Sequence, residues 1–419
     1  MRLLSVANFS CISKAEIVID RFTVIIGPQA SGKSLLVKLC YFVNDITAET
    51  QNAIVKSENL EKLSQRIKTK FLQWFPVAAW GDGKFKIQYV AGNYSIGLVR
   101  KSYKEKVQDD IRLTLSEEFK SQFAELTGQT SKGSTKKGSV EGFADLEQEW
   151  RLREIISNSY RAIQGRDAIQ SQAFVPAGRS FFTSIGKAIA IFEQGRMLDP
   201  LTLRFGRMYA NIRDRPRRFF SESATEKEER LYIENVMTSL LGGSVIQDGE
   251  TEYLEAIDGR KIPLTSLSSG QQELLPVATF LPWLWRAKST SLCYIEEPEA
   301  HLFPSTQSKL IEALIVAAGV SNLVITTHSP YVITKVNNLL KAGSLSRKLT
   351  DNMREQLSTI VARKAWLSAR HVKAYAIQNG NAVSILGKDG FIDADYLDEI
   401  SSDLSEEFSS MLDLECHHA

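Results

Sequence analysis

The residues best suited to chemistry lie in four short segments, and the first is Gly27-Pro28-Gln29-Ala30-Ser31-Gly32-Lys33-Ser34. This segment fits the pattern G-x-x-x-x-G-K-[S/T], a loop whose backbone N–H groups surround a phosphate chain. In such a loop Lys33 would contact the β- and γ-phosphates of a nucleotide, and the Ser34 hydroxyl would bind Mg²⁺. Apolar runs at residues 22–26 and 35–40 flank it, which gives the order strand, loop and helix that a phosphate site needs. An ordinary glycine-rich turn is the alternative.

The second segment is Leu267-Ser268-Ser269-Gly270-Gln271. Small residues at the start of a helix leave several backbone N–H groups without intrahelical partners, and such a helix end attracts anions. We therefore interpret Ser268, Ser269, Gly270 and Gln271 as nucleotide-binding candidates. The sequence Ser-Ser-Gly is also common in ordinary turns, so the segment alone leaves both interpretations open.

Two further segments are apolar runs that end in polar side chains. Residues 291–295 lead into Glu296 and Glu297, and residues 323–325 lead into Thr326-Thr327-His328. Glu296 would hold Mg²⁺, directly or through water, while Glu297 would orient and deprotonate the attacking water. His328 would sense the γ-phosphate and position that water. A solvated acidic strand end and a structural histidine are the alternatives.

The four segments in this order resemble those of the ABC-type ATPase superfamily, and closely its soluble AAA-like branch related to SMC proteins and to the ATPase part of OLD-family nucleases. Residues 267–271 are similar to the LSGGQ signature, with Ser269 in place of the first glycine. Residues 296–304 resemble E-E-P-E-x-H-L-x-P and residues 326–330 T-T-H-S-P. Residues 174–179 resemble a V-P-A-x-R segment.

Two features match the resemblance less closely. Glu296 stands where transporter-type members have aspartate, a change that this branch tolerates. The glutamine of the Q-loop has two candidates, Gln88 and Gln172.

The resemblance implies an α/β fold, a P-loop NTPase of ABC/SMC-head type with a mixed β-sheet core, an N-terminal antiparallel β subdomain and an inserted helical lobe. It implies ATP and Mg²⁺ as cofactors, and a head-to-tail homodimer in which Lys33 of one subunit and Ser268 with Gly270 of the other hold the same γ-phosphate. ATP hydrolysis would regulate a separate effector, a nuclease or toxin, in antiphage defence. The alternatives are a DNA-binding SMC-like scaffold and the ATPase subunit of an OLD-like nuclease. No nuclease site is predicted, since no Glu-Gly-bearing strand precedes Asp393-Ala394-Asp395.

The elements that would position these residues follow from the periodicity of apolar residues. We expect two strands and a turn before the strand at 22–26, a helix at 58–74, a hairpin formed by 85–90 and 94–99, and a charged helical segment at about 103–128. A loop at 131–139, helices at 144–163 and 222–241, and strands within 243–262 follow. The expected domains are residues 1–100 and 256–419, which form the ATPase core, and 101–255, the inserted lobe.

Composition and charge narrow the class of protein. With 419 residues and 43% hydrophobic content, the chain is long and apolar enough for a sizeable core. The Arg-rich segment 204–218 has aromatic residues between its charges, which suits nucleic acid, an acidic partner or a solvated helix end. Residues 389–415 hold ten acids and no Lys or Arg. The scattered cysteines predict no zinc site, and the absence of a signal peptide or a membrane-spanning run predicts a cytoplasmic protein without membrane contact.

Overall fold

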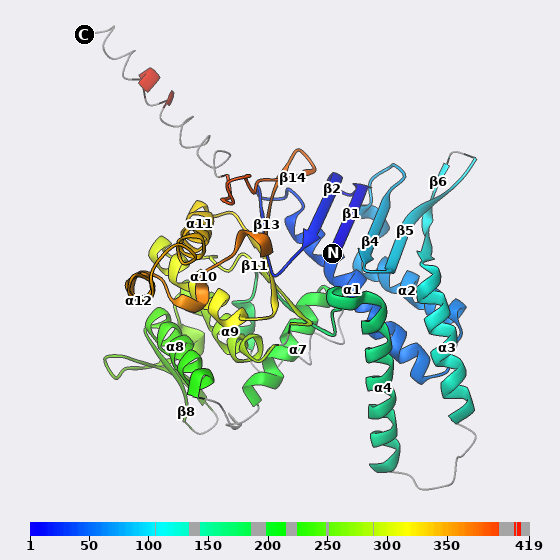
Figure 1. The fold of residues 1–419 in the computed structure, drawn as a ribbon, viewed down its shortest axis with the longest axis horizontal. Coiled ribbons are helices and arrows are strands. Elements are labelled where there is room, and N and C mark those ends of the chain that lie inside the picture. Colours follow the sequence, from blue (N-terminus) through cyan, green and yellow to red (C-terminus); the bar gives the residue numbers. More distant parts are fainter. Residues whose placement is uncertain are drawn as a thin grey trace.

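The computed structural model describes residues 1–104, 106–133, 143–185, 198–214, 224–248, 251–287, 289–393, 406–407 and 409–411. Within this part of the chain, eleven strands form a mixed sheet in the order β6-β5-β4-β1-β2-β14-β13-β3-β12-β11-β7 (Figure 1). The α/β fold with a mixed sheet that the sequence predicts is therefore confirmed. The expected loop at 131–139 lies mostly outside the described residues, as do most of the acidic segment 389–415 and residues 394–395.

One half of the sheet is parallel and consists of β13 (Val372–Gln378), β3 (Phe22–Ile26), β12 (Asn322–Thr327), β11 (Ser291–Glu296) and β7 (Ser171–Val175). Every residue of β3, β11 and β12 is buried, as expected for strands with both faces covered. Ile26 pairs with Thr327 and Glu296 pairs with Thr326. The carboxyl ends of the three neighbouring strands thus lie side by side, and they form the carboxyl edge of the parallel half of the sheet.

The other half is antiparallel, with β1 (Arg2–Phe9) between β2 (Ile12–Ile19) and β4 (Lys86–Ala91), followed by β5 (Tyr94–Tyr103) and β6 (Lys106–Leu115). The predicted N-terminal strands and the predicted hairpin are confirmed. A short strand, β14 (Asn381–Ser384), joins the two halves by pairing with both β13 and β2.

The expected helical segment at 103–128 is wrong over its first half, because residues 106–115 form the edge strand β6. Val107, Ile111, Leu113 and Leu115 are partly or fully buried, whereas most of the residues between them are exposed. This period of two is that of a strand with one covered face. The charges that suggested a helix lie on the open side of an edge strand, where they protect it from further pairing.

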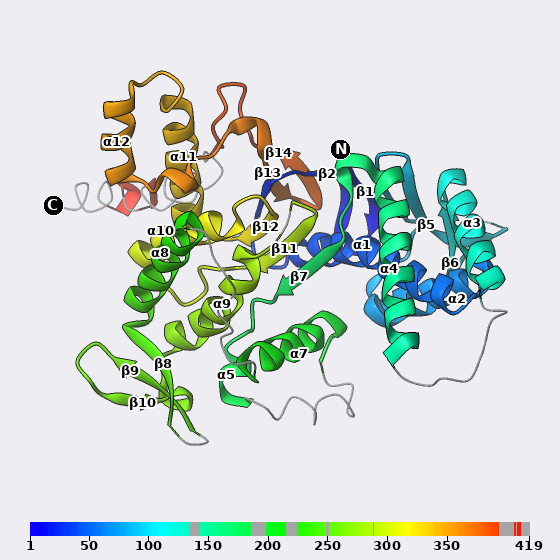
Figure 2. The same cartoon turned by 60° about the horizontal axis from the view of Figure 1, so that its bottom comes forward.

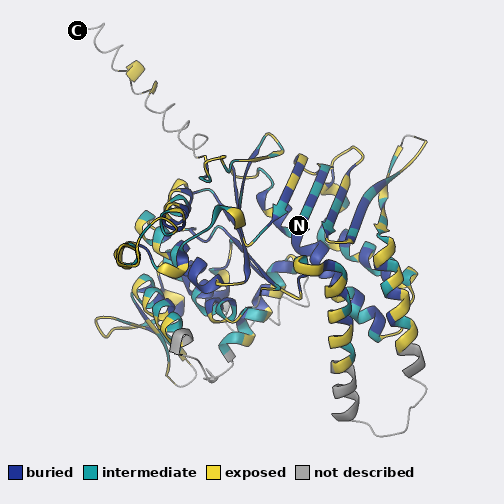
Figure 3. Ribbon diagram, in the orientation of Figure 1, coloured by how far each residue is buried: buried dark blue, intermediate teal, exposed yellow. Residues whose placement is uncertain are grey.

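Two hydrophobic cores lie on opposite faces of the sheet. The first packs α1 (Lys33–Val55) and α2 (Leu60–Trp74) against the antiparallel strands, and the second packs α8 (Ala224–Leu241), α9 (Ser269–Trp285), α10 (Pro304–Ala318) and α11 (Pro330–Leu345) against the parallel ones. Alternation along β11 serves both, because Tyr294 belongs to the first core and Ile295 to the second. Figure 3 shows the buried strands and the largely buried α1.

The remaining elements extend from this framework. α3 (Glu117–Gly133) and α4 (Phe143–Gln164) project from the sheet, and α5 (Phe181–Ile185) and α7 (Pro200–Asp214) follow β7. β8 (Gly243–Asp248), β9 (Thr251–Ala256) and β10 (Lys261–Pro263) form a small separate sheet beside α8 (Figure 2). The division into domains at residues 100 and 255 stays a prediction, and its first boundary lies within β5. No helix among the described residues is long and apolar enough to cross a membrane.

Candidate active site

The loop between β3 and α1 contains a backbone conformation that few residues can adopt. Gly32 has φ 102° and caps α1, and a Cβ atom there would lie 2.5 Å from Ile12 Cδ1 and 2.9 Å from Cys11 Sγ. Both the positive φ and the close approach of β2 thus require glycine. The Ser31 hydroxyl is buried and has no hydrogen-bond partner in the described part of the chain. A buried hydroxyl without a partner, next to the free N–H groups at the start of a helix, can donate a hydrogen bond to a bound anion.

Lys33 lies beneath this loop and is only 4% exposed. Its Nζ donates hydrogen bonds to the carbonyl oxygens of Gly27, at 3.0 Å, and Pro28, at 2.8 Å, and lies 2.9 Å from Nε2 of His328. Burial lowers the pKa of Lys33, whereas the nearby carboxylates Glu297, Glu299 and Glu296 raise it. The structure thus holds the ammonium group of Lys33 next to three carboxylates at the edge where β3, β11 and β12 end.

Glu297 and His328 form a hydrogen-bonded pair at this edge. Oε1 of Glu297 lies 2.9 Å from Nε2 of His328, and both side chains are 32% exposed. The Glu297 N–H donates to the carbonyl of Thr326, and Glu297 has φ 43°, a rare value for a residue with a side chain. His328 Nε2 either accepts a hydrogen bond from Lys33 or donates one to Glu297, according to the tautomer of the imidazole. The carboxylate of Glu297 and the ammonium group of Lys33 therefore both contact the ring of His328, at the solvent-accessible end of the site.

Glu299 positions His328, a role that the motif analysis missed. Its Oε1 accepts hydrogen bonds from the Thr327 hydroxyl, at 2.5 Å, and from the His328 backbone N–H, at 2.9 Å. The Ser329 hydroxyl donates to Gln307 of α10, at 2.5 Å. The third carboxylate of the E-E-P-E run, Glu299, was the available signal, since it follows Glu297 by two residues.

Glu296 and Ser34 are the candidate ligands for a divalent cation. Glu296 is buried, which raises the pKa of its carboxyl group, while a hydrogen bond from the Ser34 hydroxyl and the charge of Lys38 lower it. Oε1 of Glu296 has no hydrogen-bond partner among the described residues. No group of three or more Asp, Glu, His or Cys suited to a metal occurs in that part of the chain. Two oxygen donors fit Mg²⁺, which takes its other ligands from phosphate and water.

Arg179 connects the turn at 296–298 to α9 through hydrogen bonds, and the sequence analysis gave it no role. It is fully buried. Its guanidinium donates hydrogen bonds to the carbonyl oxygens of Glu296 (2.9 Å), Glu297 (3.2 Å) and Pro298 (3.2 Å), and its Nε donates to the carbonyl of Glu273 in α9 (2.9 Å). Nε also lies 3.4 Å from the Glu273 carboxylate. Burial lowers the pKa of Arg179, and Glu273 is the strongest of the carboxylates that oppose this.

The segment 268–271 begins α9. Ser268 caps the helix through its hydroxyl, which accepts from the Gln271 N–H, and the Gln271 side chain accepts from the Ser268 N–H. The Gln271 side-chain amide also donates to the carbonyl of Leu241, at 2.7 Å. Among the described residues, no hydrogen bond or ion pair joins 268–271 to the loop at 27–34. The structure brings Lys33, Ser34, Glu296, Glu297 and His328 together, and the signature segment is not part of that group.

The Q-loop candidates lie away from this edge. Gln88 is in β4, where it pairs with Ser5. Gln172 is near the start of β7, and its side chain donates to the carbonyl of Tyr41. Neither residue is placed by any contact beside the loop at 27–34.

The basic segment 204–218 is partly engaged within the protein. Arg204 forms an ion pair with Asp45 (2.6 Å) and lies over the rings of Tyr41 and Trp74. Arg213 forms an ion pair with Glu252. Arg207 also lies in α7, whereas residues 215–218, which hold the other three arginines of the run, lie outside the described residues.

Comparisons with known proteins come from sequence families and from solved structures. A family model described as "AAA domain, putative AbiEii toxin, Type IV TA system" matches residues 22–334. No curated protein matches the sequence. Similar structures include an SMC head bound to the C-terminal winged-helix domain of ScpA (10% identity, TM-score 0.42, 91% of this chain and 96% of that chain). An SMC head domain from Thermotoga maritima is 12% identical, with a TM-score of 0.37, and the match covers 92% of this chain and 98% of that chain. An ATP-binding cassette of an ABC transporter in its ADP conformation is 12% identical, with a TM-score of 0.32, and the match covers 93% of each chain.

Proposed function

Because the chain belongs to this family of AAA domains, we propose that it binds ATP with Mg²⁺ and hydrolyses the bond to the γ-phosphate. The observation that carries the proposal is that Lys33 Nζ and Glu297 Oε1 both lie 2.9 Å from Nε2 of His328, directly beyond three strands that end together. A cation for the phosphates and a carboxylate for the attacking water thus have a common neighbour that can respond to both.

Each residue has a separate part in the proposed reaction. The loop at 27–34 and the first turn of α1 surround the phosphates. The ammonium group of Lys33 then donates to phosphate oxygens in place of the carbonyl oxygens of Gly27 and Pro28. Ser34 and Glu296 hold Mg²⁺, which neutralises charge on the phosphate oxygens when bound. Glu297 accepts a proton from water as that water attacks the γ-phosphorus, and the bond from phosphorus to the bridging oxygen breaks to give ADP and phosphate. His328, positioned by Glu299, orients Glu297 and the water.

Nucleotide binding and steady-state hydrolysis test the role of Lys33. The Lys33→Ala variant should lose ATP affinity and turnover, because no other ammonium group lies among the carbonyls of Gly27 and Pro28 in the described part of the chain. Lys86→Ala is the matched control, since Lys86 is exposed in β4. ATP affinity that is equal in both variants would contradict the proposed site.

We also assign the segment 268–270 to the nucleotide of a second subunit. The support is that it presents a helix start without contact to the loop of its own chain, as the head-to-tail arrangement requires. Crosslinking of the Glu297→Gln variant with and without ATP-Mg²⁺ measures this closure. Ser268→Arg should abolish it, and Ser268→Ala is the control that loses the same helix cap without adding bulk. Equal closure with and without nucleotide would refute the shared site.

The output of the cycle is proposed to be regulation of a separate effector, a nuclease or toxin, in antiphage defence. The family description names a toxin and a type IV TA system, and α1, which begins at Lys33, packs against both α3 and α4. Movement at the phosphates would pass through α1 to that helix pair. Phage plating on cells that express wild-type protein or Glu297→Gln, together with the neighbouring genes, tests this role. Equal plating in both cases would count against it.

A further inference from the structure

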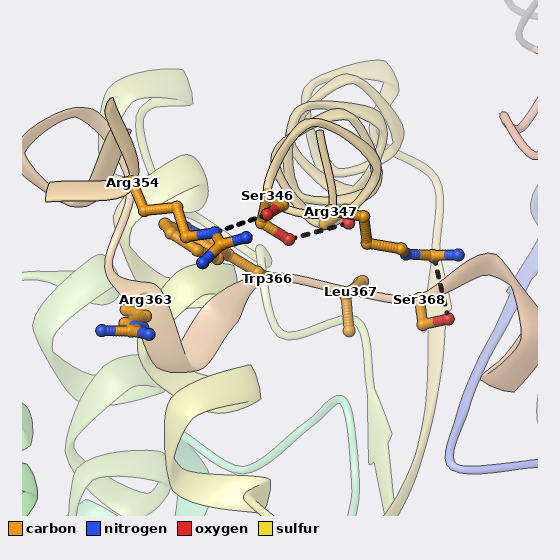
Figure 4. Close-up of a pocket in the computed structure, with 8 residues that line it drawn as sticks. Ser346, Arg347, Arg354, Arg363, Trp366, Leu367 and Ser368 are labelled. Carbon is orange, nitrogen blue, oxygen red and sulfur yellow. Dashed lines mark hydrogen bonds between the residues drawn. The ribbon is translucent and has the colours of Figure 1, made fainter. Parts of the chain in front are cut away.

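A second polar cavity lies away from the nucleotide site, beyond the C-terminal end of α11. Its volume is about 400 Å³, it is open to solvent, and the end of α11, α12 (Asp351–Ile360) and the segment 361–368 line it (Figure 4). Its lining includes Ser346, Arg347, Arg354, Arg363, Trp366 and Ser368. None of these residues belongs to the site described above.

The cavity is strongly positive and no carboxylate lines it. Residues 341–373 contain eight Lys or Arg and two acids. Two of these cations are engaged elsewhere, since Lys364 pairs with Glu229 and Lys373 lies 4.0 Å from Asp20. Asp351 forms an ion pair with Arg354, at 2.6 Å, and its side chain is 95% exposed. Unlike Arg204 and Arg213, the arginines of this cavity are not neutralised by buried or half-buried carboxylates.

The three guanidinium groups retain unused donors. Arg354 Nε donates to the carbonyl of Ser346, at 2.7 Å, and Arg347 donates a long hydrogen bond of 3.3 Å to the Ser368 hydroxyl. The guanidinium of Arg363 forms no hydrogen bond or ion pair with any residue that the structure describes. Because each guanidinium carries five N–H donors in a planar fork, most of this capacity is available to a ligand.

The floor of the cavity is fixed, whereas one wall is not. A Cβ atom on Gly343 would collide with the carbonyl oxygen of Leu367, and the Leu367 N–H donates to the carbonyl of Leu339, at 3.1 Å. The Trp366 indole donates to the carbonyl of Val361, at 3.0 Å. These contacts dock α11 against the segment 361–368. α12, in contrast, has no buried residue, so Arg354 can adjust to a ligand at little cost in packing.

We propose that this cavity binds a phosphate-bearing small molecule of nucleotide size. Guanidinium forks match phosphate oxygens two at a time, and three of them line the cavity from three separate segments. The exposed Asp351 is the carboxylate that pairs with one of them, Arg354. Ser346 and Ser368 add hydroxyl donors, and Trp366 offers an aromatic surface for a base. The volume is in the range of small-molecule sites, about 300–1,000 Å³, and is too small for a nucleic-acid duplex. α11 begins two residues after His328, so the ligand lies at the far end of the helix that leaves the catalytic histidine.

The test uses the full chain with Lys33→Ala, which removes the other phosphate site and makes the result independent of ATP hydrolysis. Calorimetric titration with pyrophosphate and with AMP distinguishes a free phosphate group from a nucleotide. We expect a dissociation constant below about 1 mM for at least one of them. Arg347→Ala and Arg363→Ala should each weaken binding about tenfold or more, and Arg363→Lys should also weaken it because lysine lacks the fork.

Arg370→Ala is the matched control, because Arg370 is exposed in the same segment and does not line the cavity. Arg347 and Arg363 are exposed, so their variants should fold normally, which thermal unfolding checks. An equal loss of affinity in Arg370→Ala would mean non-specific attraction and would overturn the proposal. So would the failure of both small probes to bind, including the case in which only a single-stranded oligonucleotide binds.

Discussion

Replacement of Arg179 by methionine should destabilise the protein and remove the hydrogen bonds that hold the turn at 296–298. The guanidinium is fully buried and donates to carbonyl oxygens on both sides of Glu297, as well as to the backbone of Glu273. Methionine fills similar volume but leaves those carbonyls and the buried Glu273 carboxylate without their cation. Removal of one partner of a buried ion pair costs about 3–5 kcal/mol of unfolding free energy.

Urea unfolding of Arg179→Met, Glu273→Gln and the double variant measures this cost and its origin. If Arg179 acts through the Glu273 carboxylate, the double variant should be destabilised by less than the sum of the two single variants, because the uncompensated charge is gone. ATP hydrolysis should fall in Arg179→Met under conditions where the protein is still folded, since the backbone of Glu297 loses its support. A loss of stability below about 1 kcal/mol, or strictly additive effects, would refute this reasoning.

Three further outcomes follow from the geometry. Gly32→Ala should lower ATP affinity about tenfold without unfolding the chain, because φ 102° and the contact with Ile12 both oppose a Cβ; unchanged affinity in a nucleotide titration would contradict this. Burial raises the pKa of Glu296 above 4.5, so protons compete with Mg²⁺ there; Mg²⁺ affinity measured against pH should fall as the pH drops through a value above 4.5, and Glu296→Gln should remove that dependence. Arg204→Ala should lower stability by about 1 kcal/mol, because the ion pair with Asp45 is partly exposed, while binding to duplex DNA measured by anisotropy stays as in the wild type.

The sequence was most informative where function depends on neighbouring residues. The loop at 27–34 is contiguous, so the spacing of its glycines, lysine and serine is enough to predict a phosphate-binding loop. Glu296, Glu297 and His328 end strands whose apolar runs are easy to recognise, and parallel pairing brings strand ends together. These residues were therefore predicted to share a site, and in the structure Glu297 and Lys33 both contact His328.

Residues that act across distant segments were not predictable in this way. Arg179 contacts residues 94 to 119 positions away, and a lone buried arginine carries no periodic signal. The strand at 106–115 was taken for a helix because an edge strand exposes charge on its open side, and only pairing with β5 reveals its type. The cavity around Arg347, Arg354 and Arg363 likewise joins three elements whose convergence is a property of the fold.

The most direct test of the account is the rate of phosphate release in a single turnover of bound ATP. Glu297 is proposed as the base, so wild-type protein and Glu297→Gln, each in excess over ATP and with saturating Mg²⁺, should bind nucleotide equally. The account predicts that Glu297→Gln releases phosphate roughly 10²–10⁴-fold more slowly, because the attacking water loses its proton acceptor. Phosphate release at the wild-type rate by a Glu297→Gln protein that has bound its ATP would contradict the central claim.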